Sequence, residues 1–261
     1  MNMIEFSESD QHRVTELCVQ TAIVLMQFSA ESVLVESVSR RLGVALGMDQ
    51  VEVALTANGI TITTVFQGRS DTTVRRNVDR GINMRAVTEV QRIMLKAEEG
   101  LLDVDGVSRE LEGISQDRYN RWVVAVMIGL SCACFARLAG ADIPASGLTF
   151  VASFVAMTTR HQLAHLHFNP LVNFAIAAFV ATSIAAQGLI LGFVGTPKIA
   201  MAASVLLLVP GFPLINSVSD MVKGYVNTGI ARGVMAGLLC AASCAGILLA
   251  MTVWDAWAWI K

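Results

Sequence analysis

Charged residues are scarce in the second half of this sequence. Only three of its 21 acidic residues and six of its 19 basic residues follow residue 121. The chain as a whole is 54% hydrophobic with a mean hydropathy of +0.58, which is too apolar for an ordinary soluble protein. We therefore expect a polar first half followed by a membrane-embedded second half.

Other features are missing, and each absence excludes a class of protein. The formal net charge is -2, so the basic surface of a nucleic-acid-binding protein is not expected. Residues 1–12 are acidic and lack the positive and apolar regions of a signal peptide, which favours a cytoplasmic location for the first half. The five cysteines do not have the spacing of a secreted disulfide framework.

Sequence signatures of catalysis are also missing. No phosphate-binding loop and no nucleophile–base pair stand out, so we expect neither an enzyme nor a bound cofactor. Three histidines, His161, His165 and His167, crowd one predicted loop. No cysteine or carboxylate stands beside them, so no metal site is expected.

The periodicity of apolar residues predicts a mainly α-helical protein whose first part, residues 1–118, is an α+β cytoplasmic domain. Helical spacing favours two helices, over about 9–28 and 29–46, and Gly47 is a natural stop for the second. A third helix follows Asn83, which is a suitable N-cap. The domain is therefore expected to contain about three helices.

Between the second and third helices the apolar period changes to two, which predicts a small β-meander. Two alternating runs flank Asn58-Gly59, which favours a hairpin with a type I′ turn because both central residues of such a turn need positive φ. A second turn at Gly68-Arg69-Ser70 leads to a short third strand over about 72–76.

Four arginines gather before the predicted third helix. They are Arg75, Arg76, Arg80 and Arg85. Backbone N–H groups at a helix N-terminus also favour anions, so the cluster is a candidate site for an anion, a carboxylate or acidic lipid headgroups. The alternative is an ordinary surface turn in which Asp79 pairs with one arginine.

Five apolar stretches in residues 119–261 predict a five-helix transmembrane bundle. Each has about the length needed to cross a hydrocarbon core of roughly 30 Å. They cover residues 122–141, 143–159, 171–194, 199–216 and 233–254. Lysines and arginines near the predicted span ends are more numerous on the side of the N-terminus, which favours a cytoplasmic N-terminus and a periplasmic C-terminus.

The fourth apolar stretch is interrupted by Pro210, Gly211 and Pro213, and Asn216 and Asp220 follow. Proline removes a helix hydrogen bond, and carbonyl groups freed in hydrocarbon must be satisfied by protein or by a water-lined cavity. The pattern is typical of a discontinuous transporter helix, so all five residues are candidates for a substrate path. The alternative is a helix that simply ends at Pro210.

Two arginines lie near predicted span ends, Arg137 in the first span and Arg160 after the second. A charge within the membrane is costly and for that reason often functional, whereas a side chain near a span end reaches the surface easily. Both arginines are therefore candidates for the substrate path, with anchoring as the alternative. The sequence has no nucleotide-binding motif, so the proton-motive force is the expected energy source for transport. Asp220 is then the first candidate for a proton carrier.

Three segments of the chain resemble the threonine/serine exporter (ThrE-like) family. They are RGINMRAVTEVQ (80–91), MIGLSCACF (127–135) and TPKIAMAASVLLLVPGFPLINSVSDMVKG (196–224). The likeness extends over nearly the whole chain, and the last segment is long and therefore specific.

The resemblance implies one subunit of a split exporter in the bacterial inner membrane, which works with a smaller, YjjB-like membrane protein to export the dicarboxylate succinate. Longer members of the family fuse the two halves and export threonine and serine. An odd number of spans agrees with a path that a partner or a homo-oligomer completes. Two alternatives stay open, namely threonine or serine export, and a membrane-anchored sensor or enzyme whose spans only locate the cytoplasmic domain.

Overall fold

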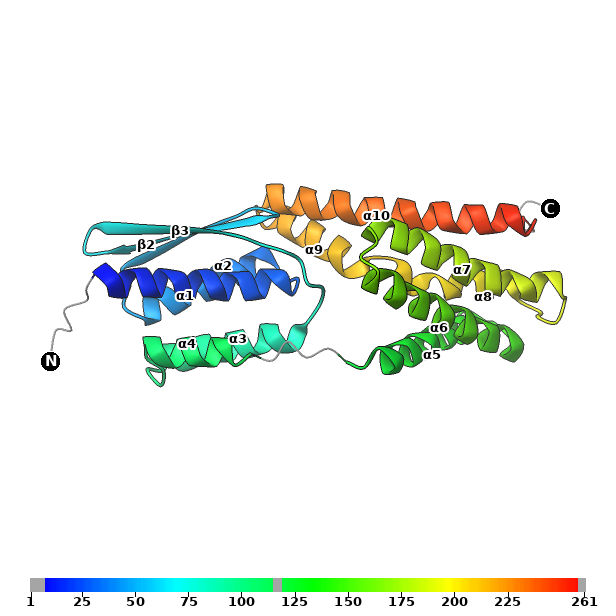
Figure 1. Cartoon of the computed structure of the whole chain (residues 1–261), viewed down its shortest axis with the longest axis horizontal. Coiled ribbons are helices and arrows are strands. Elements are labelled where there is room, and N and C mark those ends of the chain that lie inside the picture. Colours follow the sequence, from blue (N-terminus) through cyan, green and yellow to red (C-terminus); the bar gives the residue numbers. More distant parts are fainter. Residues whose placement is uncertain (1–7, 115–118, 258–261) are drawn as a thin grey trace. The chain divides into compact units, whose positions relative to one another are not determined.

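The computed structural model describes residues 8–114 and 119–257, and these are mainly helical (Figure 1). The chain folds into two compact units, each made of two stretches of sequence. The first unit combines Met1–Asp117 with Phe212–Gly233, and the second combines Arg118–Gly211 with Val234–Lys261. The domain boundary predicted at residue 118 lies outside the described residues and stays a prediction. The sequence analysis did not foresee that residues 212–233 belong to the first unit.

Helices α1 and α2 form the middle layer of the first unit. α1 covers Glu8–Gln27 and α2 covers Ser32–Ala45, close to the predicted ranges. α2 stops before Gly47, which has a φ of 96°, a backbone conformation that glycine adopts without strain.

A three-stranded antiparallel sheet packs on one side of α1 and α2 (Figure 1). The strands are β1 (Gln50–Leu55), β2 (Gly59–Phe66) and β3 (Arg69–Arg76), in the order β1-β2-β3. This confirms the predicted meander, with a third strand longer than expected. Buried polar groups join the layers, since Gln11 Nε2 donates to the Thr64 carbonyl at 3.1 Å and the Thr15 and Thr64 hydroxyls lie 2.7 Å apart.

The two positive φ angles of a type I′ turn occur in the second hairpin, so the predicted turn type at Asn58-Gly59 was wrong. Neither Asn58 nor Gly59 has a positive φ, and Gly59 is already the first residue of β2. In the second hairpin Gln67 and Gly68 are the two loop residues, with φ of 47° and 77°. Asn-Gly therefore located the first hairpin correctly without describing its turn.

Helices α3 (Met84–Glu98) and α4 (Val104–Glu112) pack against α1 from its other side (Figure 1). The Asn83 side chain accepts a hydrogen bond from the Ala86 N–H at 3.2 Å, which confirms the predicted N-cap. Asp103 caps α4 in the same way, through the Gly106 N–H at 2.8 Å. α4 was not predicted from the sequence, although its apolar residues Val104, Val107 and Leu111 follow helical spacing.

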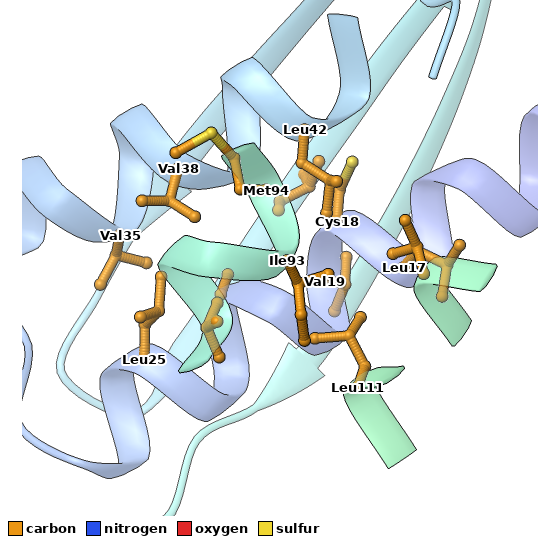
Figure 2. Packing of buried hydrophobic residues seen from close by; sticks show 14 of the residues in the cluster. Leu17, Cys18, Val19, Leu25, Val35, Val38, Leu42, Ile93, Met94 and Leu111 are labelled. Carbon is orange, nitrogen blue, oxygen red and sulfur yellow. The ribbon is translucent and has the colours of Figure 1, made fainter. Parts of the chain in front are cut away.

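Side chains from these four helices and the sheet meet in one hydrophobic core (Figure 2). Leu25 of α1, Leu42 of α2, Met94 of α3 and Leu111 of α4 are all buried there, together with Ile62 of β2. The apolar periodicity of the first half is thus explained by a globular core rather than by contact with lipid.

Helix α9 (Gly211–Val222) and the start of α10 (Val226–Val253) complete the first unit. The two helices approach closely at Gly229, where a Cβ atom would lie 2.8 Å from the Ser217 carbonyl oxygen and 2.9 Å from the Met221 nitrogen. Only glycine permits this approach. We call residues 212–233 the α9–α10 hairpin.

The second unit is helical throughout its described residues. Its helices are α5 (Arg121–Leu138), α6 (Ile143–His165), α7 (Pro170–Ile190), α8 (Pro197–Ser204), the 3-10 segment η1 (Leu206–Leu208) and α10 from Val234 onward. α7 and α10 approach closely at Gly246, where a Cβ atom would meet the Ala175 carbonyl oxygen at 2.1 Å. Small residues that allow such approaches are typical of packed membrane helices.

Three of the described helices, α5, α7 and α10, are long and apolar enough to cross a membrane. The bent pair formed by Pro197–Leu208 and Gly211–Val222 adds a fourth if it is one span. α6 has 23 residues but is not among them, since its serines, threonines and Arg160 lower its mean hydropathy. The structure thus supports three or four of the five predicted spans, and the five-helix bundle stays a prediction.

Candidate functional site

A carboxylate from α9 is fully buried in the first unit. Asp220 accepts hydrogen bonds from the Ser32 backbone N–H at 2.9 Å, from the Ser32 hydroxyl at 3.0 Å and from Arg232 Nη1 at 2.7 Å. Burying a charged group is costly unless it is paired and hydrogen-bonded, and these three donors meet that requirement. We call Ser32, Asp220 and Arg232 the Asp220 cluster.

Asp220 caps the N-terminus of α2, although it belongs to another helix. Glu31 occupies the N-cap position of α2 and makes no side-chain capping bond. The first N–H groups of a helix need acceptors, and the Asp220 carboxylate supplies one at the positive end of the helix dipole. Glu31 pairs instead with Lys223, in the turn between α9 and α10.

Arg232 of α10 links the cluster to the turn between α1 and α2. Its Nη1 donates to Asp220, and its Nη2 donates to the Ala30 carbonyl at 3.0 Å. The Arg232 side chain is only 17% exposed. Arg232 was not singled out from the sequence, because only the folded α9–α10 hairpin brings it next to Asp220.

Two more contacts hold the α9–α10 hairpin in the first unit. Asn216 Nδ2 donates to the Ser29 carbonyl at 2.8 Å, and the Tyr225 hydroxyl donates to the Glu36 carboxylate. Burial, and then the bond to Glu36, raise the pKa of Tyr225 to about 12. Asn216 and Asp220, which were predicted for a substrate path, are thus both bonded to the segment that joins α1 to α2.

Helical structure is interrupted before Pro210, at the predicted position, and a discontinuous membrane span stays a prediction. Helical structure ends at Leu208, and Val209 is extended, as expected for a residue before proline. Gly211 and Pro213 fall in the first turn of α9, where a missing N–H costs no hydrogen bond. A second helix, α9, therefore begins directly after Pro210, at an angle of 57° to the helix before it.

Hydroxyl groups satisfy the carbonyls at the broken end of α8. The Ser204 hydroxyl donates to the Met201 carbonyl at 2.8 Å, and the Ser153 hydroxyl of α6 donates to the Ser204 carbonyl at 3.1 Å. Both serines are buried. In hydrocarbon such carbonyls must find a partner within the protein, and α6 supplies it. The sequence analysis did not single out Ser153, since an isolated serine in an apolar helix carries no signal.

Arg160 lies near the end of α6 and has no carboxylate partner in the described part of the chain. Its Cζ lies 4.4 Å from the centroid of the Phe174 ring, and its backbone carbonyl accepts a bond from Asn173 Nδ2 at 3.1 Å. A cation–π contact orients the guanidinium and leaves its N–H donors available. Asn173 Oδ1 is buried and also has no partner among the described residues. The Arg160 guanidinium can therefore bind a carboxylate.

Arg137 has a different environment. It is exposed in the last turn of α5, and its guanidinium donates to the Ala141 carbonyl just beyond that helix. A cation that binds carbonyls at a helix C-terminus stabilises that end of the helix. The structure thus gives Arg137 a local capping contact that Arg160 does not have.

Asp142 was not predicted as a site residue, yet it joins two loops of the second unit. Its carboxylate accepts bonds from the Gly195 N–H at 3.2 Å, from the Thr196 N–H at 3.1 Å and from the Thr196 hydroxyl at 2.5 Å. These bonds, the Thr196 hydroxyl foremost, hold the pKa of Asp142 below its usual value. Asp142 thereby fixes the residues that lead into α8.

The arginines before α3 have separate surroundings. Arg75 pairs with Glu16 at 3.2 Å, and Arg85 pairs with Glu89 at 3.0 Å. Arg76 and Arg80 are exposed. Arg75 and Arg85 thus have carboxylate partners of their own, and a shared anion site stays a prediction.

Known proteins resemble this chain over nearly its whole length. Residues 16–254 match the family described as "Putative threonine/serine exporter". The "Probable succinate transporter subunit YjjP" of Klebsiella aerogenes is 51% identical, over 98% of this chain and 100% of that protein. The protein of the same name from Escherichia coli strain K12 is 51% identical, over 96% of this chain and 98% of that protein.

A more distant relative is an "Uncharacterized protein" of Haemophilus influenzae strain Rd, which is 35% identical over 82% of this chain and 83% of that protein. No solved structure gives a significant match. The family match and the full-length relatives agree with the interrupted α8–η1–α9 segment and the apolar helices. This chain belongs to the putative threonine/serine exporter family.

Proposed function

We propose that this chain is a subunit of a secondary exporter that moves a small dicarboxylate, succinate, out across the bacterial inner membrane. Two relatives that match nearly the full length are named as succinate transporter subunits. The word "subunit" in those names supports a second chain, for which we propose a YjjB-like membrane protein. A homo-oligomer of this chain is the simplest further assembly.

The observation that carries a transport function is the interrupted helix. A membrane anchor gains nothing from a span broken at Pro210, with Ser153 and Ser204 placed to satisfy its carbonyls. In transporters such breaks expose backbone groups at the substrate site. We therefore place Pro210, Gly211 and Pro213 on the substrate path.

Arg160 is our first candidate for binding a substrate carboxylate. Succinate carries two negative charges, and a guanidinium binds a carboxylate through two parallel hydrogen bonds. Arg160 faces Phe174 and has no carboxylate partner in the described residues, whereas Arg137 binds a carbonyl next to its own helix. Arg137 is therefore the second candidate.

Asn216 and Asp220 belong to the α9 half of the interrupted segment, and in this proposal they couple that half to the cytoplasmic domain. Asp220 is also the candidate proton carrier of an exporter driven by the proton-motive force. An Asp220→Asn variant that exports with unchanged pH dependence would exclude the proton-carrier role.

The proposed topology has five spans, a cytoplasmic N-terminus and a periplasmic C-terminus. α6 then crosses the membrane as well, its polar hydroxyls facing the bundle. Arg121 and Arg160, at the ends of α5 and α6, and Lys223, in the turn between α9 and α10, lie on the cytoplasmic side in this arrangement, as the distribution of positive charge favours.

The test is succinate efflux from preloaded cells that lack their own exporters. The chain is expressed alone and then with its YjjB-like partner, and membrane levels of both proteins are measured as the control. We expect efflux only with both. Absence of efflux with both proteins in the membrane would contradict succinate export.

Export of threonine or serine is the second candidate, because the family description names these substrates. The same cells, preloaded with threonine or serine, distinguish the two proposals. Efflux of the amino acids without efflux of succinate would replace the first proposal with the second.

A further inference from the structure

The end of β3, the segment that follows it and the first residues of α3 expose apolar and basic side chains together. Residues 74–85, here called the apolar–basic loop, include four large apolar side chains that are 42% to 61% exposed, namely Val74, Val78, Ile82 and Met84. They alternate with the exposed arginines Arg75, Arg76, Arg80 and Arg85. Exposed apolar side chains in such a group indicate a contact surface.

The apolar–basic loop is held in one conformation by its backbone. The Asn77 N–H donates to the Asn58 carbonyl at 2.9 Å, and the Arg80 N–H donates to the Gln27 carbonyl at 3.0 Å. The single acidic residue of the loop, Asp79, accepts the Gly81 N–H at 2.8 Å within its own turn. The apolar side chains are therefore exposed on a backbone that is anchored at two points. Arginine dominates the charge of the loop itself, and Arg75 and Arg85 also pair with Glu16 and Glu89, which lie outside it.

The Gln27 carbonyl, which accepts the Arg80 N–H, lies beside groups that bind the α9–α10 hairpin. Gln27 ends α1, and the carbonyls of Ser29 and Ala30, two and three residues later, accept bonds from Asn216 and Arg232. Within the first unit, the apolar–basic loop passes this end of α1 on its way to α3 (Figure 1).

The Asn58 carbonyl, which accepts the Asn77 N–H, lies at the same end of the first unit. Asn58 is in the turn after β1, and the carbonyl of Leu55, the last residue of β1, accepts a bond from the Thr228 hydroxyl of α10 at 3.4 Å. The α9–α10 hairpin continues along the chain into apolar helices at both of its ends. The apolar–basic loop therefore lies beside the α9–α10 hairpin, which is the part of the first unit that continues along the chain into apolar helices.

We propose that the apolar–basic loop docks on the bilayer surface, where its arginines bind anionic phospholipid headgroups and Val78 and Ile82 enter the headgroup–acyl boundary. Basic side chains next to apolar ones are the combination that binds such a surface. Each arginine near an anionic leaflet favours the docked state about fivefold. The docked loop fixes the cytoplasmic domain against the membrane beside the α9–α10 hairpin.

The test uses the full chain in lipid nanodiscs without any partner. A bimane label is placed on an Ile82→Cys variant in which Cys134, Cys240 and Cys244 are replaced by alanine, and quenching by nitroxide-labelled lipid is measured. The matched control is Leu101→Cys, because Leu101 is 68% exposed but follows α3, roughly 20 Å along that helix from Met84.

We expect strong quenching at position 82 in nanodiscs containing phosphatidylglycerol, and little at position 101. Replacing Arg76 and Arg80 by glutamine should lower the ratio of docked to free loop, measured by quenching at position 82, by about fivefold for each arginine removed. Nanodiscs of phosphatidylcholine alone should lower the same ratio. Equal quenching at both positions would overturn the proposal. So would a label at position 82 that lipid never quenches but that becomes shielded from water when the second subunit is added, since the surface would then contact protein.

Hydrogen exchange of the unsubstituted chain gives an independent measurement that needs no cysteine replacements. Amides of residues 78–82 should exchange more slowly in nanodiscs with phosphatidylglycerol than in nanodiscs without it, while amides of residues 100–103 should not change. Identical exchange of residues 78–82 in both lipids would overturn the proposal.

Discussion

Single carboxylates in this protein join segments that are distant in the sequence. Asp220 binds the start of α2, 188 residues before it, and Asp142 binds Thr196, 54 residues after it. Both accept backbone N–H groups outside their own helix. The local sequence does not reveal such contacts, because the same sequence pattern is expected for a carboxylate that anchors a span end, carries a proton or caps a helix.

The Asp220–Arg232 pair is expected to show strong coupling. Asp220→Asn and Arg232→Met each leave the other charge buried without its opposite charge, and each should lower the free energy of unfolding by about 3–5 kcal/mol. The double variant should lose much less than the sum, because no unpaired charge remains. Denaturant unfolding of the purified chain in detergent measures this cycle.

The control for this cycle is Lys223→Met, which breaks the half-exposed pair with Glu31. Exposed pairs contribute up to about 1 kcal/mol, so the loss should stay small. Strictly additive effects of Asp220→Asn and Arg232→Met would show that the two side chains do not act as a pair.

Arg160 should be more important for export than Arg137. Arg160→Gln removes a charged donor that has no carboxylate partner in the described residues, and a charge-assisted bond contributes roughly 1.5–3 kcal/mol, so efflux should fall about tenfold or more. Arg160→Lys should only partly restore efflux, since lysine lacks the planar fork. Efflux per unit of membrane-inserted protein is the measurement.

Arg137→Gln is the matched control, because its guanidinium binds the carbonyl at the end of its own helix. We expect it to alter efflux much less. If Arg137→Gln impairs efflux as strongly as Arg160→Gln, Arg160 loses its distinction as the carboxylate-binding residue.

At the scale of helices and strands, the sequence predicted what short-range periodicity determines. The β-meander, the Asn83 cap and the break at Pro210 each depend on a few adjacent residues, and all three are present. The type I′ turn was assigned to Asn58-Gly59 because Asn-Gly favours positive φ, but Gln67-Gly68 adopts it. Helix α4 was missed although Val104, Val107 and Leu111 have helical spacing, so that failure was one of interpretation and not of signal.

The turn between α9 and α10 provides a titratable marker of its packing. Burial, and then the bond to Glu36, raise the pKa of Tyr225 from 10 to about 12. A raised pKa means that the folded state holds the proton more tightly. The resulting stabilisation is complete below pH 10 and is lost as the pH rises through about 12.

Absorbance at 295 nm follows the ionisation of Tyr225 in a Tyr119→Phe background, which removes the second tyrosine of the chain. The midpoint should lie near pH 12, and Glu36→Gln should move it part of the way back toward 10. A midpoint near 10 with Glu36 intact would show that the Tyr225 hydroxyl is not held by the first unit.

At the scale of the whole molecule, the sequence correctly indicated a polar part and an apolar part but not how the chain is divided between units. The change in composition after residue 121 suggests one boundary, whereas the first unit takes in residues 212–233 as well. Nothing local marks that hairpin as part of the first unit, because Ser32 and Glu36 lie 188 and 189 residues before their partners in the hairpin. The Asp220 cluster became visible only when the fold brought both ends together.

A two-part first unit makes a prediction about fragments. Residues 8–117 alone leave the first turn of α2 without the Asp220 cap, and Glu31 and Glu36 without Lys223 and Tyr225. Adding residues 212–233 through a flexible linker should restore these contacts and raise the melting temperature. The amides at the start of α2 should then exchange more slowly.

The matched control is the same linked fragment with Asp220→Asn, which should lose most of the gain in melting temperature. If the unlinked fragment melts at the same temperature as the linked one, the α9–α10 hairpin is not an integral part of the first unit, and a domain formed by the N-terminal residues alone becomes the better description.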